Sequence, residues 1–222
     1  MIKTVIFDMD GVLLDTERMM TECSLTICKK LGVENAEQLA LENAGVAGSE
    51  IRKKMGEILG GGYNEGKRFY QKFGALYVKR LLLEGIPVKE NIEETLKYLK
   101  EHGYTLAVAS TTKTPLVKLM LSICGLKKYF DSIMGGDKVE NRKPAPDIYL
   151  KSMEKIGKTS EECYAVEDSL VGAKASIDAG IKTIIIPDLQ EPNEYNKENA
   201  YKIFDSAKDL LEFFKKENEE PN

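Results

Sequence analysis

The sequence holds one histidine in 222 residues, His102, and this scarcity limits the chemistry open to the protein. A metal centre built on several imidazoles is excluded, because such centres draw on more than one histidine. A Ser-His-Asp triad would depend on His102 alone, and this residue lies at a predicted helix end, where the helix dipole favours a polar or cationic group. Catalytic groups of other types are therefore expected.

Cysteine is also scarce and lacks the spacing of a metal or redox site. The four cysteines, Cys23, Cys28, Cys124 and Cys163, include no C-x-x-C pair. The first two fall in a helical pattern and the last begins a predicted strand. Reduced thiols that pack as small hydrophobic side chains are therefore expected.

The sequence has neither a strong excess of one charge nor a long apolar run. Its 32 basic and 36 acidic residues are well mixed and give a net charge of −4, without the basic patch that binds nucleic acid or an anionic membrane. No apolar run is long enough to cross a bilayer, and the first residues lack a signal-peptide pattern. We expect a cytoplasmic protein, a monomer or weak dimer, with no nucleic-acid or membrane partner.

Two regions with different periodicity follow the first predicted strand. Residues 16–85 carry apolar side chains at spacings of three and four, which predicts an all-helical insert. From residue 86 onward, predicted strands alternate with helices, as in a parallel sheet covered on both faces. We predict an α/β protein with a Rossmann-like three-layer parallel-sheet core of residues 1–15 and 86–222, and an inserted all-helical domain of residues 16–85.

A glycine-rich run, Leu59–Gly66, lies within the helical region. Such a run can cradle phosphate when it follows a strand and opens a helix. Here it joins two predicted helices, so we interpret it as a flexible connector.

The first predicted strand, Thr4–Phe7, ends in Asp8-Met9-Asp10-Gly11. Ligands of open α/β sheets bind outside the carboxyl ends of the strands, so Asp8 and Asp10 stand where a reacting group would be held. Gly11 allows the backbone to turn away sharply. The alternative for this stretch alone is a solvated Asp-Gly turn.

Polar groups also follow strands later in the chain. Ser110–Lys113 offers hydroxyls, free amides and a cation, a combination that can hold phosphate oxygens. Lys143 lies in a loop with two prolines, which reduce backbone freedom. Glu167 and Asp168 end a strand at a helix start. Each group alone has an ordinary alternative, either a helix cap or an exposed loop lysine.

Together these strand ends meet the needs of phosphoryl transfer. Asp8, Asp10 and Asp168 would place about three negative charges in one pocket, which is unfavourable without a cation. Oxygen ligands without histidine or thiolate favour Mg²⁺. Lys143 supplies a second positive charge and Ser110 a neutral donor, as required around a transferring phosphoryl group.

On these residues the sequence resembles the haloacid dehalogenase superfamily, and in particular its phosphatases with a helical cap inserted after the first strand. The matched motifs are Asp8-Met9-Asp10-Gly11-Val12, Ser110, Lys143 within Arg142–Asp147, and Glu167-Asp168 with Gly172-Ala173. Their order and spacing agree over nearly the whole chain, which makes the set more specific than any one motif.

The resemblance implies a role for each matched residue. Asp8 would be the nucleophile that forms an aspartyl-phosphate, and Asp10 the general acid and base. Ser110 and Lys143 would hold the phosphoryl group. Mg²⁺ would be bound by Asp8, the backbone carbonyl of Asp10 and Asp168, with Glu167 as a direct or water-mediated ligand. The presence of Asp10 favours phosphate over halide chemistry, because the dehalogenases proper lack this acid and need no metal.

The expected substrate is a small phosphorylated metabolite, for which a sugar phosphate is one candidate. The predicted substrate contacts are Thr16, Glu17, Arg52, Thr111 and Lys113. For Arg52 the alternative is a solvated helix face.

Two other functions stay open. The resemblance extends to β-phosphoglucomutases, which hold a second phosphate with a histidine, an arginine and a lysine of the cap. This chain has Met20, Gly48 and Phe73 at the corresponding places, so we predict a phosphatase rather than a mutase. A non-catalytic protein that binds a phosphorylated ligand would be expected to lack Asp8 or Asp10, and both are present.

Overall fold

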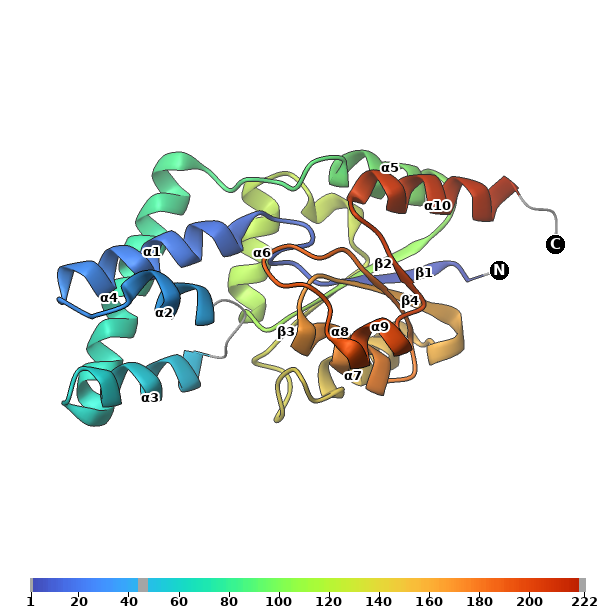
Figure 1. The fold of residues 1–222 in the computed structure, drawn as a ribbon. Coiled ribbons are helices and arrows are strands. Elements are labelled where there is room, and N and C mark those ends of the chain that lie inside the picture. Colours follow the sequence, from blue (N-terminus) through green and yellow to red (C-terminus); the bar gives the residue numbers. More distant parts are fainter. Residues whose placement is uncertain (1, 44–47, 220–222) are drawn as a thin grey trace. The chain divides into compact units, whose positions relative to one another are not determined.

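The computed structural model describes residues 2–43 and 48–219, which form two compact units (Figure 1). One unit comprises Met1–Asp15 and Pro87–Asn222, and the other comprises Thr16–Ile86. We refer to them as the α/β unit and the helical unit. The helical unit begins after the first strand and its turn, so in sequence it is an insertion into the α/β unit.

Parallel strands form the sheet of the α/β unit, in the order β3-β2-β1-β4-β5-β6. The strands are β1 (Thr4–Phe7), β2 (Thr105–Ser110), β3 (Ser132–Gly135), β4 (Cys163–Glu167), β5 (Lys182–Ile185) and β6 (Lys202–Ile203). Phe7 of β1 is in register with Val108 of β2 on one side and with Val166 of β4 on the other. The residues that follow β1, β2 and β4 therefore meet at the end of the sheet where its parallel strands finish. We call this end the carboxyl edge, and the end where the strands start the amino edge.

Helices cover both faces of this sheet (Figure 1). One face is covered by α5 (Ile92–Glu101) and α10 (Ala207–Glu219). The other face is covered by α7 (Asp147–Ile156), α8 (Leu170–Asp178) and α9 (Glu194–Asn199). A further helix of this unit, α6 (Thr114–Ile123), connects β2 to β3. All residues of β1 are buried, as expected for a strand covered on both sides. Ile6 packs in a buried cluster with Ala107, Ala165 and Tyr149, so α7 rests on the middle of the sheet.

The segments that enter and leave the helical unit are paired within the α/β unit. The backbone N–H of Asp15 donates to the Pro87 carbonyl at 2.9 Å, and that of Lys89 donates to the Leu13 carbonyl at 3.0 Å. Leu14 also forms an antiparallel bridge next to them. The two ends of the insertion are therefore held side by side.

The helical unit is built from four helices in its described residues. They are α1 (Thr16–Lys30), α2 (Ala36–Glu42), α3 (Gly48–Ile58) and α4 (Gly62–Glu84). Each helix contributes to one buried cluster, which includes Ile27, Leu39, Met55 and Phe69. Burial of such a side chain stabilises a fold by roughly 1.5–3 kcal/mol, so this cluster holds the helices together.

Two glycines let α3 and α4 approach closely. A Cβ added to Gly56 would overlap the backbone of Gly62, and one added to Gly66 would overlap the backbone of Arg52. The interpretation of Leu59–Gly66 as a flexible connector is therefore wrong beyond its first residues. The run starts a helix at Gly62, and Gly66 packs against the neighbouring helix.

Other differences from the predicted elements are small. The short elements α2, α9 and β6 are not predicted, because seven, six and two residues carry too little periodic signal. Asn91 precedes α5 at a position where asparagine often caps a helix, but its backbone is left-handed with a φ of 61° and its side chain makes no cap hydrogen bond.

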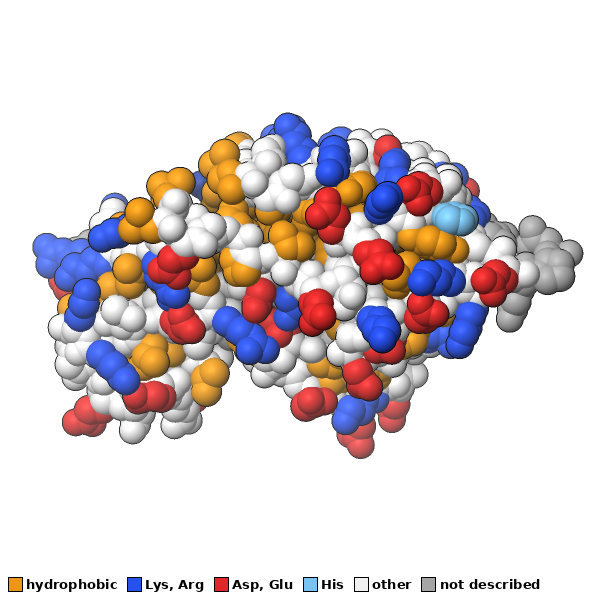
Figure 2. All heavy atoms as spheres, turned by 90° about the horizontal axis from the view of Figure 1, so that it is seen from above, with side chains coloured by type: hydrophobic (Ala, Val, Ile, Leu, Met, Phe, Trp, Pro, Cys, Tyr) orange, Lys and Arg blue, Asp and Glu red, His pale blue; other side chains and the backbone are white. Residues whose placement is uncertain are grey.

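The composition has simple counterparts in the structure. All four cysteines are free thiols, and three of them are buried. Among residues 2–43 and 48–219, no helix is long and apolar enough to cross a bilayer. Figure 2 shows one face of the molecule, on which basic and acidic side chains are interspersed. The charges that are mixed in the sequence are therefore mixed in space on this face as well.

Candidate active site

The turn after β1 places two carboxylates at the carboxyl edge of the sheet. Asp8 is tied to β4 by its backbone N–H, which donates to the Val166 carbonyl at 2.9 Å. Gly11 has a φ of 89°, which glycine adopts without strain. A Cβ at this position would overlap the Asp168 carboxylate. Gly11 therefore turns the chain and also leaves room for the acid that follows β4.

Lys143 brings its ammonium group into contact with two acids. Its side chain is 3% exposed, and Nζ donates to Asp8 Oδ1 at 2.5 Å and to Glu167 Oε1 at 2.6 Å. A third hydrogen bond of 3.0 Å goes to the Ala109 carbonyl at the end of β2. An ammonium group has three protons, so these three acceptors satisfy it fully.

Burial dominates the electrostatics of this group. It raises the pKa of the Asp8 carboxyl well above its ordinary value; Lys143 opposes the rise, and the Glu167 and Asp10 carboxylates add to it. Burial on its own would lower the pKa of the Lys143 ammonium, but the charges of Asp8 and Glu167 raise that pKa above its ordinary value. Lys143 therefore stays charged, and the buried acids outnumber it.

Glu167 is bound by a residue that the sequence pattern did not single out. Tyr149 of α7 donates its hydroxyl to Glu167 Oε1 at 2.5 Å. Burial, together with the charges of Glu167 and Asp8, raises the pKa of the Tyr149 phenol well above its ordinary value, so it remains a donor. Tyr149 lies in the first turn of the helix that follows the Lys143 loop, and that position is the signal that could have identified it.

Asp10 faces the loop that follows β2. Its Oδ2 accepts a hydrogen bond from Thr112 Oγ1 at 3.2 Å and a longer one from Ser110 Oγ at 3.4 Å. Ser110 is fully buried and also accepts from the Thr112 N–H at 3.1 Å. Thr112 lies within the Ser110–Lys113 stretch that the sequence marks as a possible phosphate site, but no individual role was predicted for it.

The predicted substrate contacts fall in two places. Thr111 and Lys113 are exposed in the loop after β2. Thr16 and Glu17 are buried in the first turn of α1, and Arg52 lies on α3, all within the helical unit. The Arg52 guanidinium lies 5.1 Å from the centre of the Tyr70 ring, a contact that gives it a packing partner inside that unit.

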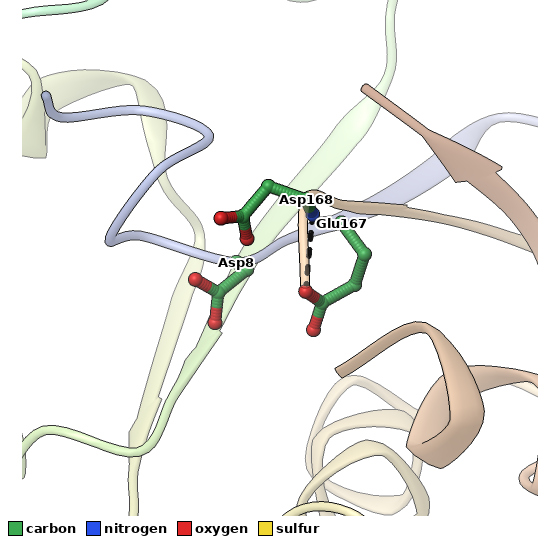
Figure 3. A group of neighbouring side chains, drawn as sticks. All are labelled: Asp8, Glu167 and Asp168. Atoms are coloured by element: carbon green, nitrogen blue, oxygen red, sulfur yellow. Dashed lines mark hydrogen bonds between the residues drawn. The ribbon is translucent and has the colours of Figure 1, made fainter. Parts of the chain in front are cut away.

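Three carboxylates of the α/β unit are close enough to share a metal ion. Asp8, Glu167 and Asp168 each offer an oxygen, and these atoms lie within 4.8 Å of one another. Figure 3 shows the Asp8 and Asp168 carboxylates close together at the end of β1, with the Glu167 carboxylate to one side. An all-oxygen donor set, in a space that Gly11 keeps open, fits a hard divalent cation such as Mg²⁺.

Comparison with known proteins agrees with this arrangement. Residues 5–186 match the family model of the haloacid dehalogenase-like hydrolases. A phosphorylated carbohydrates phosphatase from Thermotoga maritima is 34% identical over 185 residues, which are 82% of this chain and 83% of that protein. A Thermotoga maritima structure provisionally classed as a β-phosphoglucomutase has a TM-score of 0.78 and 28% identity, covering 96% of this chain and 99% of its own.

A second solved structure adds a bound ligand. It is the protein CbbY from Rhodobacter sphaeroides in complex with phosphate, with a TM-score of 0.75 and 27% identity, covering 95% of this chain and 96% of that chain. The family model spans well over half of the sequence, and its range includes the strand ends that carry Asp8, Ser110 and Asp168 and the loop that carries Lys143. This chain therefore belongs to the haloacid dehalogenase-like hydrolase family.

Proposed function

We propose that the protein is a Mg²⁺-dependent phosphatase that hydrolyses a small phosphorylated metabolite, with a sugar phosphate as the first candidate. One observation carries the proposal. The buried Asp8 carboxylate is held by Lys143, and a second acid, Asp10, lies two residues away on the same turn. Hydrolysis in two steps needs such a pair, one group to attack phosphorus and one to move protons.

In the first step Asp8 attacks the phosphorus atom. Lys143 binds Oδ1, which leaves Oδ2 as the attacking oxygen. A bond forms between Oδ2 and phosphorus, the bond from phosphorus to the leaving oxygen breaks, and the Asp10 carboxyl gives that oxygen its proton. The esterified Asp8 is a weaker acceptor, so the Lys143 N–H that donated to it now donates to a phosphoryl oxygen, and Lys143 keeps its proton.

In the second step the aspartyl-phosphate is hydrolysed. The Asp10 carboxylate takes a proton from a water molecule, whose oxygen attacks phosphorus. The bond between Asp8 Oδ2 and phosphorus breaks, and inorganic phosphate leaves. The hydroxyls of Ser110 and Thr112 orient the Asp10 carboxylate throughout, and the amides of the loop after β2 are neutral donors for phosphoryl oxygens.

Asp8, Asp168 and the backbone carbonyl of Asp10 would hold the Mg²⁺ ion, with Glu167 beside them. When bound, the ion supplies positive charge that stabilises the transferring phosphoryl group. The closeness of the three buried carboxyl groups supports this assignment, because oxygens within 4.8 Å of one another favour a cation among them.

We assign the helical unit the role of a cap that selects the substrate, with contacts from Thr16, Glu17 and Arg52, and with Thr111 and Lys113 contributing from the α/β unit. Its position as an insertion directly after β1 supports this role. The free thiols are in keeping with a cytoplasmic location.

A β-phosphoglucomutase is the second candidate, favoured by the likeness to the Thermotoga maritima structure of that class. The helical unit gives an argument against it. Phe73 stands where a mutase is expected to carry a lysine, and its ring stacks on Tyr77 with 6.2 Å between the ring centres. This position therefore offers packing in place of a cation for a second phosphate.

A panel of phosphorylated metabolites, including β-glucose 1-phosphate, tests the proposal. We expect at least one substrate to release inorganic phosphate in stoichiometric amounts, and EDTA to stop the release until Mg²⁺ is restored. Conversion of β-glucose 1-phosphate to glucose 6-phosphate with little free phosphate would favour the mutase. Full activity in EDTA would refute the metal-dependent mechanism. The Asp8→Asn protein, purified in the same way, controls for contaminating phosphatases.

A further inference from the structure

We propose that Tyr149 is a positioning residue of this site. Its hydroxyl fixes the Glu167 carboxylate as the partner of Lys143 and keeps it from turning toward Asp8 and Asp168. The inference rests on the proposed function, because it assigns Glu167 to the lysine and the other two acids to the cation within the same site.

The hydrogen bonds to the two Glu167 oxygens are unequal. Oε1 accepts from Tyr149 Oη at 2.5 Å and from Lys143 Nζ at 2.6 Å. Oε2 has longer contacts, 3.3 Å to the Asp168 N–H and 3.5 Å to Ser169 Oγ. Short bonds to one oxygen determine how the carboxylate is turned. Without the Tyr149 hydroxyl, the bond from Lys143 would be the one short hydrogen bond left to Glu167 among those that the described residues make.

The Glu167 carboxylate lies in a closely packed pocket between α7 and α8. Gly172 of α8 lies against it, and a Cβ there would overlap both carboxylate oxygens. The Tyr149 ring contacts the other partner, with Lys143 Nζ 5.1 Å from the ring centre. Glu167 and Tyr149 are both fully buried. Tyr149 therefore contacts the Glu167 carboxylate with its hydroxyl and the Lys143 ammonium with its ring.

Glu167 is within reach of two positive partners. One is Lys143, and the other is a cation at the Asp8 and Asp168 carboxylates, whose oxygens lie within 4.8 Å of an oxygen of Glu167. If Glu167 turned to the cation, the ion would gain a ligand and Lys143 would lose a counter-ion. We therefore expect loss of the Tyr149 hydroxyl to slow turnover without weakening Mg²⁺ binding.

Tyr149→Phe tests this inference, because it keeps the ring and removes one oxygen. Tyr164→Phe is a matched control. Tyr164 is also buried and donates to a carboxylate, Glu217 Oε2 at 3.0 Å, but it lies near the start of β4, at the other edge of the sheet. We expect Tyr149→Phe to lower kcat roughly 10-fold, with KM within about twofold, while Tyr164→Phe leaves kcat unchanged.

Binding of Mg²⁺, measured by calorimetry, separates positioning from general damage. We expect Tyr149→Phe to bind Mg²⁺ at least as tightly as the unaltered protein. A kcat within twofold of the unaltered protein would overturn the inference. Weakened Mg²⁺ binding in parallel with a lower kcat would overturn it as well, because it would indicate a distorted site.

A readout without turnover distinguishes failure of this inference from failure of the proposed function. In protein labelled with ¹⁵N-lysine, the Lys143 ammonium signal can be assigned by its loss in Lys143→Arg. We expect this signal to shift or broaden in Tyr149→Phe and to stay in place in Tyr164→Phe. If the protein hydrolyses no phosphate ester, the proposed function fails, and an unmoved Lys143 signal would still overturn the role of Tyr149.

Discussion

Lysine–carboxylate pairs occur at both the carboxyl edge and the amino edge of the sheet, but they differ in how far they are exposed to solvent. At the carboxyl edge, Lys143 is 3% exposed and its partner Glu167 is fully buried. At the amino edge, a cavity of about 650 Å³ is lined by Thr4, Lys158, Glu162 and other residues near the strand starts. Lys158 pairs there with Glu162 at 2.9 Å, and these side chains are 34% and 47% exposed. A lysine–carboxylate pair is thus buried at one edge and solvated at the other.

Pairs of the same residue types differ here in burial, and burial decides how strongly their charges act on neighbouring groups. Exposed ion pairs contribute little to stability, and water screens their charges. Buried charges must be balanced by neighbours, and any imbalance calls for a cation or a charged ligand. The amino edge has a cavity lined by solvated ion pairs, whereas the carboxyl edge has a cluster of buried acids around Lys143, and that is where we place the reaction.

The largest predicted effect breaks the chemistry at the carboxyl edge. Asp8→Asn keeps the size of the side chain but removes the attacking carboxylate oxygen, so we expect phosphate release to fall by about 10⁴-fold or more. Glu217→Gln, at the amino edge, should leave the rate unchanged. Initial rates at saturating substrate measure both. A rate for Asp8→Asn close to that of the unaltered protein would remove Asp8 from its role.

The second prediction compares the two lysines directly. Without metal, Lys143→Met leaves buried acids without their cation, so we expect the free energy of unfolding to fall by about 3 kcal/mol or more. Lys158→Met removes an exposed pair and should barely shift the midpoint of urea unfolding. Urea titrations in EDTA, followed by circular dichroism, measure these effects. Similar shifts for the two variants would contradict the contrast between the edges.

The third prediction separates proton transfer from attack. Asp10→Asn keeps a hydrogen-bond acceptor for Ser110 and Thr112 but can no longer move protons. We expect turnover to fall by about 10²-fold or more, with an unchanged circular dichroism spectrum. Rates of phosphate release for the purified variant provide the test. Turnover near that of the unaltered protein would mean that another group moves the proton.

The smallest predicted effect concerns a cap beside the site. The Asp137 carboxylate accepts from the Thr114 N–H at 2.6 Å and from its hydroxyl at 2.7 Å. These hydrogen bonds lower the pKa of Asp137 to about 2, below its unfolded value of about 3.9. The ionised carboxylate therefore stabilises the fold above about pH 4, and this contribution is lost as the pH falls through about 2.

Asp137→Ala should accordingly lower the melting temperature slightly at pH 7, because α6 loses a partner at its start. The difference from the unaltered protein should shrink as the pH is lowered toward 2, and thermal melts over this range measure it. A difference of constant size at all pH values would show that the charge of Asp137 is not its source.

Much of the fold could be predicted because its signals are local. β1 has its predicted bounds, since an apolar run stopped by Asp8-Met9-Asp10-Gly11 contains both a strand signal and its end. α2 could not be predicted, because it is short and only three of its residues are buried. β6 is the outermost strand of the sheet and consists of two exposed residues, so it carries no apolar alternation.

The site could be predicted in part for a similar reason. Asp8, Lys143 and Asp168 follow different strands or their loops, and a parallel sheet brings such segments to one edge whatever lies between them. The contacts that Tyr149 and Gly172 make with Glu167 could not be predicted in this way, although the sequence marks Gly172 by its motif and Tyr149 by its place after the Lys143 loop. Their part depends on how far a phenol reaches from α7 and on the space that α8 leaves for a carboxylate, and neither quantity is set by local periodicity.

The pairing of Asp15 with Pro87 has a consequence for how such a protein can change. Because the chain leaves and re-enters the α/β unit at neighbouring points, a short turn could bridge them, or another insertion could replace the helical one, without altering the register of β1. The junction is therefore a point at which one inserted domain can be exchanged for another. New specificities can be tried there while the strand that bears the reacting carboxylates remains untouched.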